Sequence, residues 1–264
     1  MTEKRTAPMT EKRTAPMTGM APPVVEVSVS QKEQLNRDGY FITDVLFDEP
    51  TLAPVRQLFE ELASGQEQTR AGGVFAYSLH SQSDICRQFL SHPVFADVCR
   101  QLLGPTVFQS WNQMIFKSPA AKSADFAWHQ DGYYGAYNPD GTDKEGADNI
   151  SLKGNITFWL ALTPATIQNG CLWALPGEHK EGLLPHRWNE ERREWSGTYD
   201  TSGEVPAEMG PGQMLVFTRL TPHRSGPNTT DQPRIGYQIG YGVEPGAYDQ
   251  IPFLDDGEIV DLSQ

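Results

Sequence analysis

RIGYQIGYGV, residues 234–243, is the stretch that best indicates the fold class of this chain. Apolar or aromatic side chains occupy every second position in it, which is the period of a β-strand with one face on a core. Similar short apolar or alternating runs, separated by Gly, Pro, Asn and Asp, fill the chain beyond Thr106; they are TVFQSWNQMIFK, NITFWLAL, CLWALP and GQMLVFT. Strands at this spacing, without helices regularly between them, predict an antiparallel sandwich or barrel rather than a βαβ sheet.

The first half of the chain carries the helix signals. Ser30 and Glu33 have capping-box spacing and predict a short helix that closes near Gly39. Asp48 and Pro50 predict the start of a second helix, whose apolar stripe would lie on the sheet. That stripe is Leu52, Val55, Leu58, Phe59 and Leu62. The other elements expected here are a strand over GYFITDVLF, residues 39–47, and a helix from Val94 to Leu103. These helices would cover the outside of the strand-rich half.

The composition restricts the kind of partner. The 264 residues include 21 Lys and Arg against 34 Asp and Glu, giving a formal net charge of -13, whereas binding to nucleic acid or an anionic membrane needs a basic surface. We therefore expect a small-molecule partner. No run approaches the ~18 to 20 apolar residues of a membrane span, and no signal-peptide pattern is present. Three dispersed cysteines, Cys86, Cys99 and Cys171, argue against a disulfide framework and favour a reducing, cytoplasmic setting.

The N-terminus repeats itself. Residues 1–8, MTEKRTAP, recur as residues 9–16, and no hydrophobic periodicity accompanies the repeat. Eight residues are too few for a solenoid unit, which needs ~20 or more. We therefore predict a disordered tail over residues 1–23 and a single domain over residues 24–264.

The residue pattern with the clearest chemistry lies in WHQDGYYGAY, residues 128–137. In a strand, side chains two positions apart share a face, so His129 and Asp131 can both point into a barrel mouth while Gln130 points elsewhere. The best candidate for a third ligand is His223, directly after the strand GQMLVFT. Two histidines and one carboxylate suit Fe(II) and leave coordination positions open for a 2-oxoacid and O2.

A 2-oxoacid cosubstrate also needs a cation for its distal carboxylate. Arg234 follows His223 by eleven residues, on the next expected strand, and its planar guanidinium suits a bidentate carboxylate contact. Ser225 lies two residues after His223 and would share its face, so its hydroxyl could donate to the same carboxylate.

With these residues in place, the chain resembles the phytanoyl-CoA dioxygenase family of Fe(II)/2-oxoglutarate oxygenases. The resemblance rests on WHQD at 128–131, NGCLWALPGEHKEG at 169–182, HRSGPN at 223–228 and Arg234, and it runs from about residue 30 to 245. It implies a mostly β fold with flanking helices, the double-stranded β-helix or cupin-like jelly roll. It implies His129, Asp131 and His223 as iron ligands, and Arg234 and Ser225 as holders of 2-oxoglutarate. Further candidates for the cofactor pocket are Lys117, Gln113, Thr157 and Trp173.

The substrate side of the pocket is expected to be aromatic. Candidate substrate contacts are Tyr133, Tyr134, Tyr137, Trp111 and Arg219. The polar, Gly-rich residues 138–149 are predicted to form a lid, and residues 186–200 an opposite wall. The remaining histidines, His80, His92, His179 and His186, are expected to be structural.

The family resemblance implies oxidation of a small metabolite, typical of secondary-metabolite biosynthesis, while 2-oxoglutarate is converted to succinate and CO2. Related halogenases have Gly or Ala in place of the carboxylate, so Asp131 favours hydroxylation over chlorination. Desaturation, epoxidation and rearrangement use the same ligands. Two alternatives remain: a redox-neutral cupin-type metal isomerase, which has no need for Arg234, and a metal-free jelly-roll binding module.

Overall fold

The computed structural model describes residues 24–65, 73–119, 125–144, 154–244 and 251–260. The predicted N-terminal tail lies outside the described residues, and so does the second half of the predicted lid.

The described chain contains seven helical segments, which alternate with strands mainly in its first half. They are α1 (Val29–Asp38), α2 (Glu49–Ala63), η1 (Leu79–Ser81), α3 (Asp84–Leu90), α4 (Pro93–Leu102), α5 (Asp131–Ala136) and η3 (Glu178–Glu181). The strands are β1 (Tyr40–Ile42), β2 (Val74–Tyr77), β3 (Val107–Lys117), β4 (Phe126–His129), β5 (Asn155–Ala161), β6 (Leu172–Ala174), β7 (His186–Asn189), β8 (Glu194–Gly197), β9 (Val205–Ala207), β10 (Met214–Thr218), β11 (His223–Ser225), β12 (Arg234–Gly242), β13 (Ile251–Asp255) and β14 (Glu258–Ile259).

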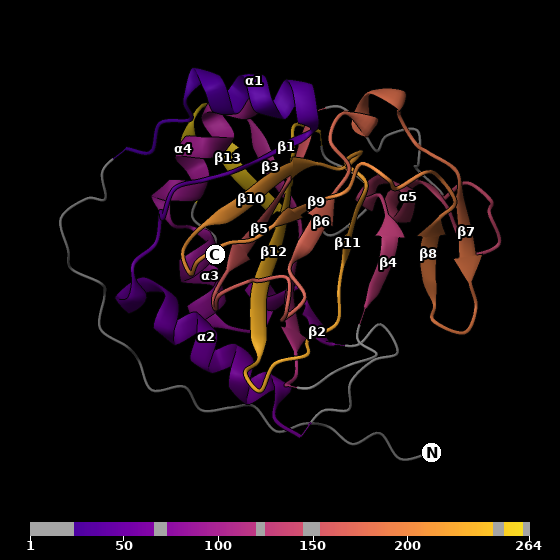
Figure 1. Cartoon of the computed structure of the whole chain (residues 1–264). Helices are drawn as coiled ribbons and strands as arrows, with labels where there is room; N and C mark the ends of the chain where they lie inside the picture. The colour runs from indigo at the N-terminus through magenta and orange to yellow at the C-terminus, as the bar shows by residue number, and fades with distance from the viewer. Residues whose placement is uncertain (1–23, 66–72, 120–124, 145–153, 245–250, 261–264) are drawn as a thin grey trace, which may run out of the picture.

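The strands form two main antiparallel sheets. The large sheet has the order β1-β10-β5-β12-β3-β13-β14, with β2 also paired to β3, and the small sheet has the order β4-β11-β6-β9. Strands β7 and β8 form a separate hairpin. Figure 1 shows α2, α3 and α4 on one side of the large sheet and the small sheet on the other. The predicted jelly roll with flanking helices is confirmed.

Strand β5 shows how the sequence produces these layers. Ile156, Phe158 and Leu160 belong to the core formed with the helices, while Trp159 and Ala161 belong to the core between the two sheets. This alternation is the two-residue period of a strand that is buried on both faces. The helices and the small sheet therefore cover opposite faces of the large sheet.

Two glycines of β12 make room between the sheets. A Cβ atom at Gly236 would lie 2.1 Å from Cζ2 of Trp159, and a Cβ atom at Gly240 would lie 2.4 Å from Nε1 of Trp111. Real side chains do not approach so closely, so glycine is required for the two indole rings to lie against the sheet. The rings in turn form part of a cavity wall.

The helix predictions are largely confirmed. Helix α2 starts after Asp48, whose carboxylate accepts a hydrogen bond from the Thr51 backbone N–H, and its predicted apolar stripe is buried except for half-buried Leu62. Helix α4 lies within one residue of the predicted range. Helix α1 ends at Asp38 and is capped by Gly39, as expected.

The start of α1 was predicted wrongly. The capping box is formed by Ser28 and Gln31, not by Ser30 and Glu33: the Ser28 hydroxyl accepts from the Gln31 N–H at 3.1 Å, and the Gln31 side chain accepts from the Ser28 N–H at 2.9 Å. Glutamine serves this motif as well as glutamate. Buried Val27 fixes where the chain enters the helix.

The strand predicted over residues 39–47 is also shorter than expected. Only Tyr40–Ile42 form a ladder with β10, which begins at Met214. Beyond Ile42 the pairing is reduced to single hydrogen bonds, from the Thr43 N–H to the carbonyl oxygen of Met214 at 2.9 Å and from the Leu46 N–H to that of Gly212 at 2.9 Å. Helices α3 and α5 were not predicted, since each has fewer than eight residues and shows no helical periodicity over a useful window.

Candidate metal centre

The small sheet brings two histidines together from distant parts of the chain. His129 ends β4 and His223 begins β11, and the two are direct antiparallel partners. Their ring centroids lie 4.1 Å apart. Because the sheet sets this pairing, their proximity follows from the register of two strands.

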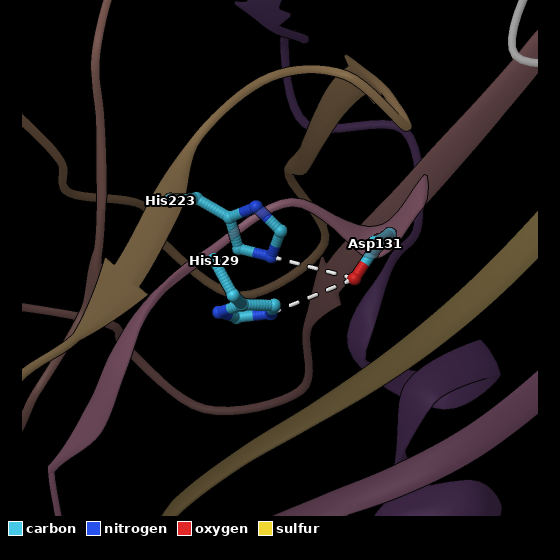
Figure 2. A group of neighbouring side chains, drawn as sticks. All are labelled: His129, Asp131 and His223. Carbon is cyan, nitrogen blue, oxygen red and sulfur yellow. Dashed lines mark ion pairs between the residues drawn. The ribbon is translucent and has the colours of Figure 1, made fainter. Parts of the chain in front are cut away.

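Asp131 reaches the same point in a different way from the one predicted. It is the first residue of α5 and not part of a strand, so the expected alternation of strand faces does not apply to it. The chain turns into a helix after Gln130, and this turn directs the carboxylate back toward the histidines. Figure 2 shows the three side chains converging, with Nε2 of His129 3.6 Å and Nε2 of His223 3.7 Å from Oδ1 of Asp131.

The two imidazole rings are held in one tautomer. Nδ1 of His129 lies 2.8 Å from the carbonyl oxygen of Ala127, and Nδ1 of His223 lies 3.0 Å from that of Thr221. A carbonyl oxygen only accepts hydrogen bonds, so Nδ1 carries the proton in both rings. The lone pair of each neutral imidazole is therefore on Nε2, the atom that faces Asp131.

The carboxylate of Asp131 is held from one side only. Its Oδ2 accepts hydrogen bonds from Oγ1 of Thr157 at 3.1 Å and from Nε2 of Gln238 at 3.3 Å. Its Oδ1 faces the two histidines. Hydrogen-bond donors therefore hold Oδ2, while Oδ1 is left facing the histidine nitrogens. This arrangement orients the Asp131 carboxylate to bind a metal through one oxygen.

The electrostatics favour the ligating protonation states. Burial alone would raise the pKa of the Asp131 carboxyl, but its neighbours outweigh that effect and lower the pKa to about 2. The neighbours responsible are His223, His129 and Arg219. Burial, followed by the proximity of His129, lowers the pKa of His223 to about 4. An anionic carboxylate beside a neutral imidazole is the combination that a divalent metal requires.

Gln130 lies between two of these residues but faces away from them, as predicted. Its Nε2 donates to the carbonyl oxygens of Gly182 at 2.8 Å and Leu220 at 2.6 Å, and its Oε1 accepts from the Leu184 N–H at 2.8 Å. His186, predicted to be structural, accepts a hydrogen bond from the Gln130 N–H. These bonds fix the backbone between His129 and Asp131.

A buried cation lies at another part of the same space. Arg234 is 1% exposed and its guanidinium stacks over the Trp159 ring at 5.0 Å. None of its three nitrogens has a hydrogen-bond partner among the described residues. Burial lowers its pKa to about 10, so the group stays charged at neutral pH. A buried, charged guanidinium with this much unused donor capacity suits an anionic ligand.

Lys117 is the direct strand partner of Arg234. Its Nζ donates to Oγ of Ser225 at 2.9 Å and to the carbonyl oxygen of Gly226. Burial and the neighbouring Arg234 hold the pKa of Lys117 well below its usual range. Lys117, Ser225 and Arg234 therefore form one polar end of the space.

These groups line a single cavity of about 310 Å³. Of the residues predicted for the site, those on its wall are the three ligands, Arg234, Ser225, Lys117, Gln113, Trp111, Tyr134 and Arg219. Gln238 also lines the cavity but was not predicted, although it shares a strand face with Arg234. That shared face, four residues apart on β12, is the signal that could have identified it.

Three predicted contacts do not line the cavity. Trp173 packs under the guanidinium of Arg224 at 4.7 Å, outside the wall. Tyr133 packs against His186, and Tyr137 packs against Tyr133. Tyr133 lies on the side of α5 that faces away from the cavity, because a helix separates neighbouring side chains by about 100°. Tyr137 follows α5 as its extended C-cap residue.

Thr157 and residues 186–200 lie behind the groups that line the cavity. Thr157 does not appear on the wall but contacts Asp131 behind it. Residues 186–200 were predicted to form an opposite wall, but none of them is among the described residues that line the cavity. Their hairpin packs behind α5 instead, where the Trp195 N–H donates to the Tyr134 hydroxyl oxygen.

The donor atoms fit a metal ion. The three ligand atoms of His129, Asp131 and His223 all lie within 4.8 Å of one another, close enough for one ion to contact all three. Two nitrogens and one carboxylate oxygen on one side of an ion are the ligand set of non-haem Fe(II) sites, with open positions opposite. The guanidinium of Arg234, which has no hydrogen-bond partner in the described part of the chain, lies in the same cavity and fits the far carboxylate of a dicarboxylic cosubstrate.

Comparisons with known proteins agree with this chemistry. The family model "Phytanoyl-CoA dioxygenase (PhyH)" matches residues 35–236. The chain is 38% identical to the methylphosphonate hydroxylase of Gimesia maris over 93 residues, which are 35% of each protein. It is 34% identical to phytanoyl-CoA dioxygenase 1 of Oryza sativa subsp. japonica over 139 residues, 50% of this chain and 47% of that protein.

Solved structures give the same fold. EvdO2 from Micromonospora carbonacea var. aurantiaca, in complex with 2-oxoglutarate, superimposes with a TM-score of 0.66 at 24% identity, covering 87% of this chain and 96% of that one. The match to the curated relatives spans only about a third to a half of their length. Among the described residues, no helix is both long and apolar enough to cross a bilayer.

Proposed function

Because the chain belongs to the phytanoyl-CoA dioxygenase family, we propose that it is an Fe(II)- and 2-oxoglutarate-dependent oxygenase that hydroxylates a small organic molecule. One oxygen atom of O2 enters the substrate as a hydroxyl group and the other enters succinate, while 2-oxoglutarate loses CO2. The observation that carries this proposal is the presence, in one cavity, of a two-histidine, one-carboxylate cluster and a buried arginine without a hydrogen-bond partner among the described residues.

Each residue has a distinct part in this proposal. His129, Asp131 and His223 hold iron, and Arg234 binds the distal carboxylate of 2-oxoglutarate through its unused N–H donors. The hydroxyl of Ser225, itself held by Lys117, lies at the same end and can donate to that carboxylate. When bound, iron and 2-oxoglutarate supply the redox chemistry that activates O2. The protein supplies orientation and a cavity that limits access of water.

The residues around Asp131 keep one coordination mode available. Thr157 and Gln238 occupy Oδ2, so the carboxylate offers Oδ1 to the metal. A metal held by a single carboxylate oxygen keeps more positions open for cosubstrate and O2 than one held by both. Because the carboxylate is present, no ligand position is vacated for chloride, which supports oxygenation over chlorination.

Both alternatives from the sequence are less well supported. A redox-neutral isomerase has no use for a buried arginine reserved for a second anionic ligand. A metal-free binding module has no use for two imidazoles whose lone pairs converge on a carboxylate, since burying such a set has a cost.

Two relatives support a proposed cellular role. The similarity to a methylphosphonate hydroxylase and to the dioxygenase lolE1 of Epichloe uncinata, 34% identical over 79 residues, supports metabolism of small organic compounds, including secondary metabolites. We place the enzyme in the cytoplasm, because its three cysteines are all free and buried, as in a reducing setting.

The proposed function is tested by measuring succinate. The full chain incubated with Fe(II), 2-oxoglutarate and O2 should form succinate, even slowly in the absence of substrate, and a candidate metabolite pool should yield a product heavier by one oxygen atom. Labelled O2 should supply that atom. The variant His223→Ala is the control. Succinate formation that is absent from the wild type, or equal in the control, would contradict the proposal.

A further inference from the structure

We infer that the substrate carries a hydroxyl or N–H group beside a flat apolar portion, and that the side-chain oxygen of Gln113 accepts a hydrogen bond from that group. This inference rests on the proposed function, because it names the substrate class of the same cavity. Three features carry it: a row of side chains across the large sheet, a chain of two amides that ends at a metal ligand, and aromatic rings beside that chain.

A row of side chains crosses the face of the large sheet that lines the cavity. Gln113 on β3 pairs directly with Tyr77 on β2 and with Gln238 on β12. Gln238 pairs in turn with Trp159 on β5. Direct partners on neighbouring antiparallel strands project from the same face, and all four side chains line the cavity. The register therefore places Gln113 between exposed Tyr77 and Gln238, which contacts Asp131.

The orientation of the two amides follows from Asp131. A carboxylate only accepts hydrogen bonds, so Gln238 must present its Nε2 to Oδ2 of Asp131, at 3.3 Å. The Oε1 of Gln238 then faces Gln113, whose Nε2 donates to it at 2.7 Å. The Oε1 of Gln113 occupies the other position of its amide, away from Gln238.

This oxygen is an acceptor that the cosubstrate cannot use. Among the described residues, the side chain of Gln113 makes one hydrogen bond, through its Nε2, and its Oε1 accepts none. The side chain is half-buried and lines the cavity. Ionised 2-oxoglutarate has two carboxylates and a keto group but no N–H or O–H to donate. Gln113, predicted as a residue of the cofactor pocket, is therefore better suited to a donor group on the substrate.

An aromatic strip, formed by Phe75, Tyr77 and Phe126, runs beside Gln113. The rings of Phe75 and Tyr77 on β2 are nearly parallel, with an interplanar angle of 13° and centroids 6.5 Å apart. The ring of Phe126 lies 6.4 Å from that of Phe75 and 4.5 Å from that of His129. All three line the cavity, and Tyr77 is 60% exposed. A strip that leads from a metal ligand to the surface suits a flat apolar group.

The size of the cavity restricts the substrate further. Its volume of about 310 Å³ is at the lower end of the range for small-molecule pockets, roughly 300 to 1,000 Å³. 2-Oxoglutarate must share this space. The part of the substrate that enters is therefore small, although a larger apolar body can extend past Tyr77.

The test compares two isomers that differ in the donor. 2-Phenylethanol ends in a hydroxyl group, whereas benzyl methyl ether has a side chain of the same length with an ether oxygen and no donor. Each is titrated by ligand-observed NMR into the full chain loaded with 2-oxoglutarate and diamagnetic Zn(II), which takes the same nitrogen and oxygen ligands as iron. The alcohol should bind at least about threefold more tightly, as expected for one neutral hydrogen bond.

Variants assign this preference to Gln113. Gln113→Leu removes the acceptor and should remove the preference, whereas Gln113→Glu keeps an acceptor oxygen and should retain it. Tyr77→Ala should weaken the binding of both isomers equally, since they share the phenyl ring. Gln57→Leu, at an exposed glutamine of α2, is the matched control and should change neither affinity. A purely structural role of Gln113 would lower both affinities alike and leave their ratio unchanged.

The outcomes separate this inference from the proposed function. Equal binding of the two isomers, no binding of either, or a preference that survives in Gln113→Leu would overturn the inference. Wild-type affinity of Tyr77→Ala for both isomers would also overturn it, since the aromatic strip would then not hold the apolar portion. The visible absorption of the same preparation with Fe(II) and 2-oxoglutarate tests the proposed function. If no chelate band forms, that function fails even where the isomers are distinguished; if the band forms and the isomers bind equally, the inference alone fails.

Discussion

Three side chains determine what the centre can bind, and each is fixed by a different contact. Backbone carbonyl oxygens hold the protons of His129 and His223 on Nδ1. Side-chain donors hold one oxygen of Asp131. Nε2 of each histidine faces Oδ1 of Asp131, and the three ligand atoms lie within 4.8 Å of one another. The ligand geometry therefore exists before any metal binds. Preorganisation of this kind reduces the reorganisation that accompanies metal binding.

The contact between Thr157 and Asp131 predicts a loss of metal affinity. Thr157→Val keeps the shape of the side chain but removes the donor to Oδ2, so the carboxylate can rotate. We expect the affinity for Fe(II) to fall about tenfold, the lower end of effects at groups that orient metal ligands. Anaerobic metal titration measures this change. Thr198→Val, at an exposed threonine, should leave the affinity unchanged, and an equal loss in both variants would contradict the role of Thr157.

Arg234 predicts a separation between metal and cosubstrate binding. Arg234→Ala removes the buried guanidinium without touching a metal ligand. We expect the 2-oxoglutarate concentration needed for half-maximal succinate formation to rise at least about tenfold, since charge-assisted contacts contribute about 1.5 to 3 kcal/mol. Fe(II) affinity, measured by titration, should stay within about twofold. An unchanged 2-oxoglutarate requirement would reject the role of Arg234.

At the scale of elements, strand alternation does most of the positioning. On β12 the aromatic and aliphatic residues Ile235, Tyr237 and Ile239 join the core under the helices, so Arg234 and Gln238 face the cavity. The same strand carries glycine where indole rings lie against it. Strand β12 thus packs against the helices, carries Arg234 and contacts the metal ligand Asp131 through Gln238.

The glycines of β12 predict a stability effect with a functional consequence. Gly236→Ala would place a methyl group against Trp159, whose ring also stacks under Arg234. We expect a loss of about 1 to 3 kcal/mol in the free energy of unfolding, measured by denaturant titration, together with weaker 2-oxoglutarate binding. Gly203→Ala is the matched control, because its added methyl would meet no atom within 4 Å. A wild-type stability for Gly236→Ala would show that the indole ring can move aside.

The elements that could be predicted from sequence are those with a clear period. The alternation in RIGYQIGYGV and the apolar stripe of α2 each span enough residues to exceed chance, and both were predicted correctly. Helices α3 and α5 are too short to show a period, and the Tyr-rich sequence of α5 does not resemble a helix. For this reason the prediction that His129 and Asp131 lie in one strand was wrong, because Asp131 belongs to α5. The prediction that their side chains point to the same place is confirmed.

The site residues likewise include some that could be predicted from the sequence and some that could not. The metal ligands and Arg234 could be proposed from residue type and spacing, because histidine, aspartate and arginine are unusual among the apolar residues around them. The spacing of Gln238 from Arg234 could have placed it on the cavity face, but its contact with Asp131 depends on how strands far apart in the chain are brought together. The placement of Tyr133 depends on helix rotation in a helix that was not predicted. Contacts behind the ligands are therefore the part that sequence could not supply.

At the scale of the whole molecule, the centre joins segments that are far apart in the chain. His129 and His223 meet across the small sheet, and Asp131 is held by β5 and β12 of the large sheet. Figure 1 shows that β4 and β11 lie on the side of the molecule opposite α2 and α3. A ligand at this centre bridges both sheets and should stabilise the whole fold.

That bridging predicts a thermal shift. Redox-inert Mn(II) together with 2-oxoglutarate should raise the unfolding temperature of the wild type, since a ligand at about 100 times its Kd adds about 2.7 kcal/mol to the free energy of unfolding. The shift should vanish in His223→Ala and fall in Arg234→Ala when 2-oxoglutarate is limiting. Differential scanning calorimetry measures it. An equal shift in wild type and His223→Ala would place the metal elsewhere.

The most direct test of the central claim is anaerobic absorption spectroscopy of the full chain with Fe(II) and 2-oxoglutarate. If His129, Asp131 and His223 hold iron with open positions and Arg234 orients the cosubstrate, the mixture should develop the weak visible charge-transfer band of an iron–2-oxoacid chelate. The band should require both components and should be lost in His129→Ala. A folded wild-type protein that shows no such band at saturating Fe(II) and 2-oxoglutarate would contradict the assignment of this cavity as an oxygenase site.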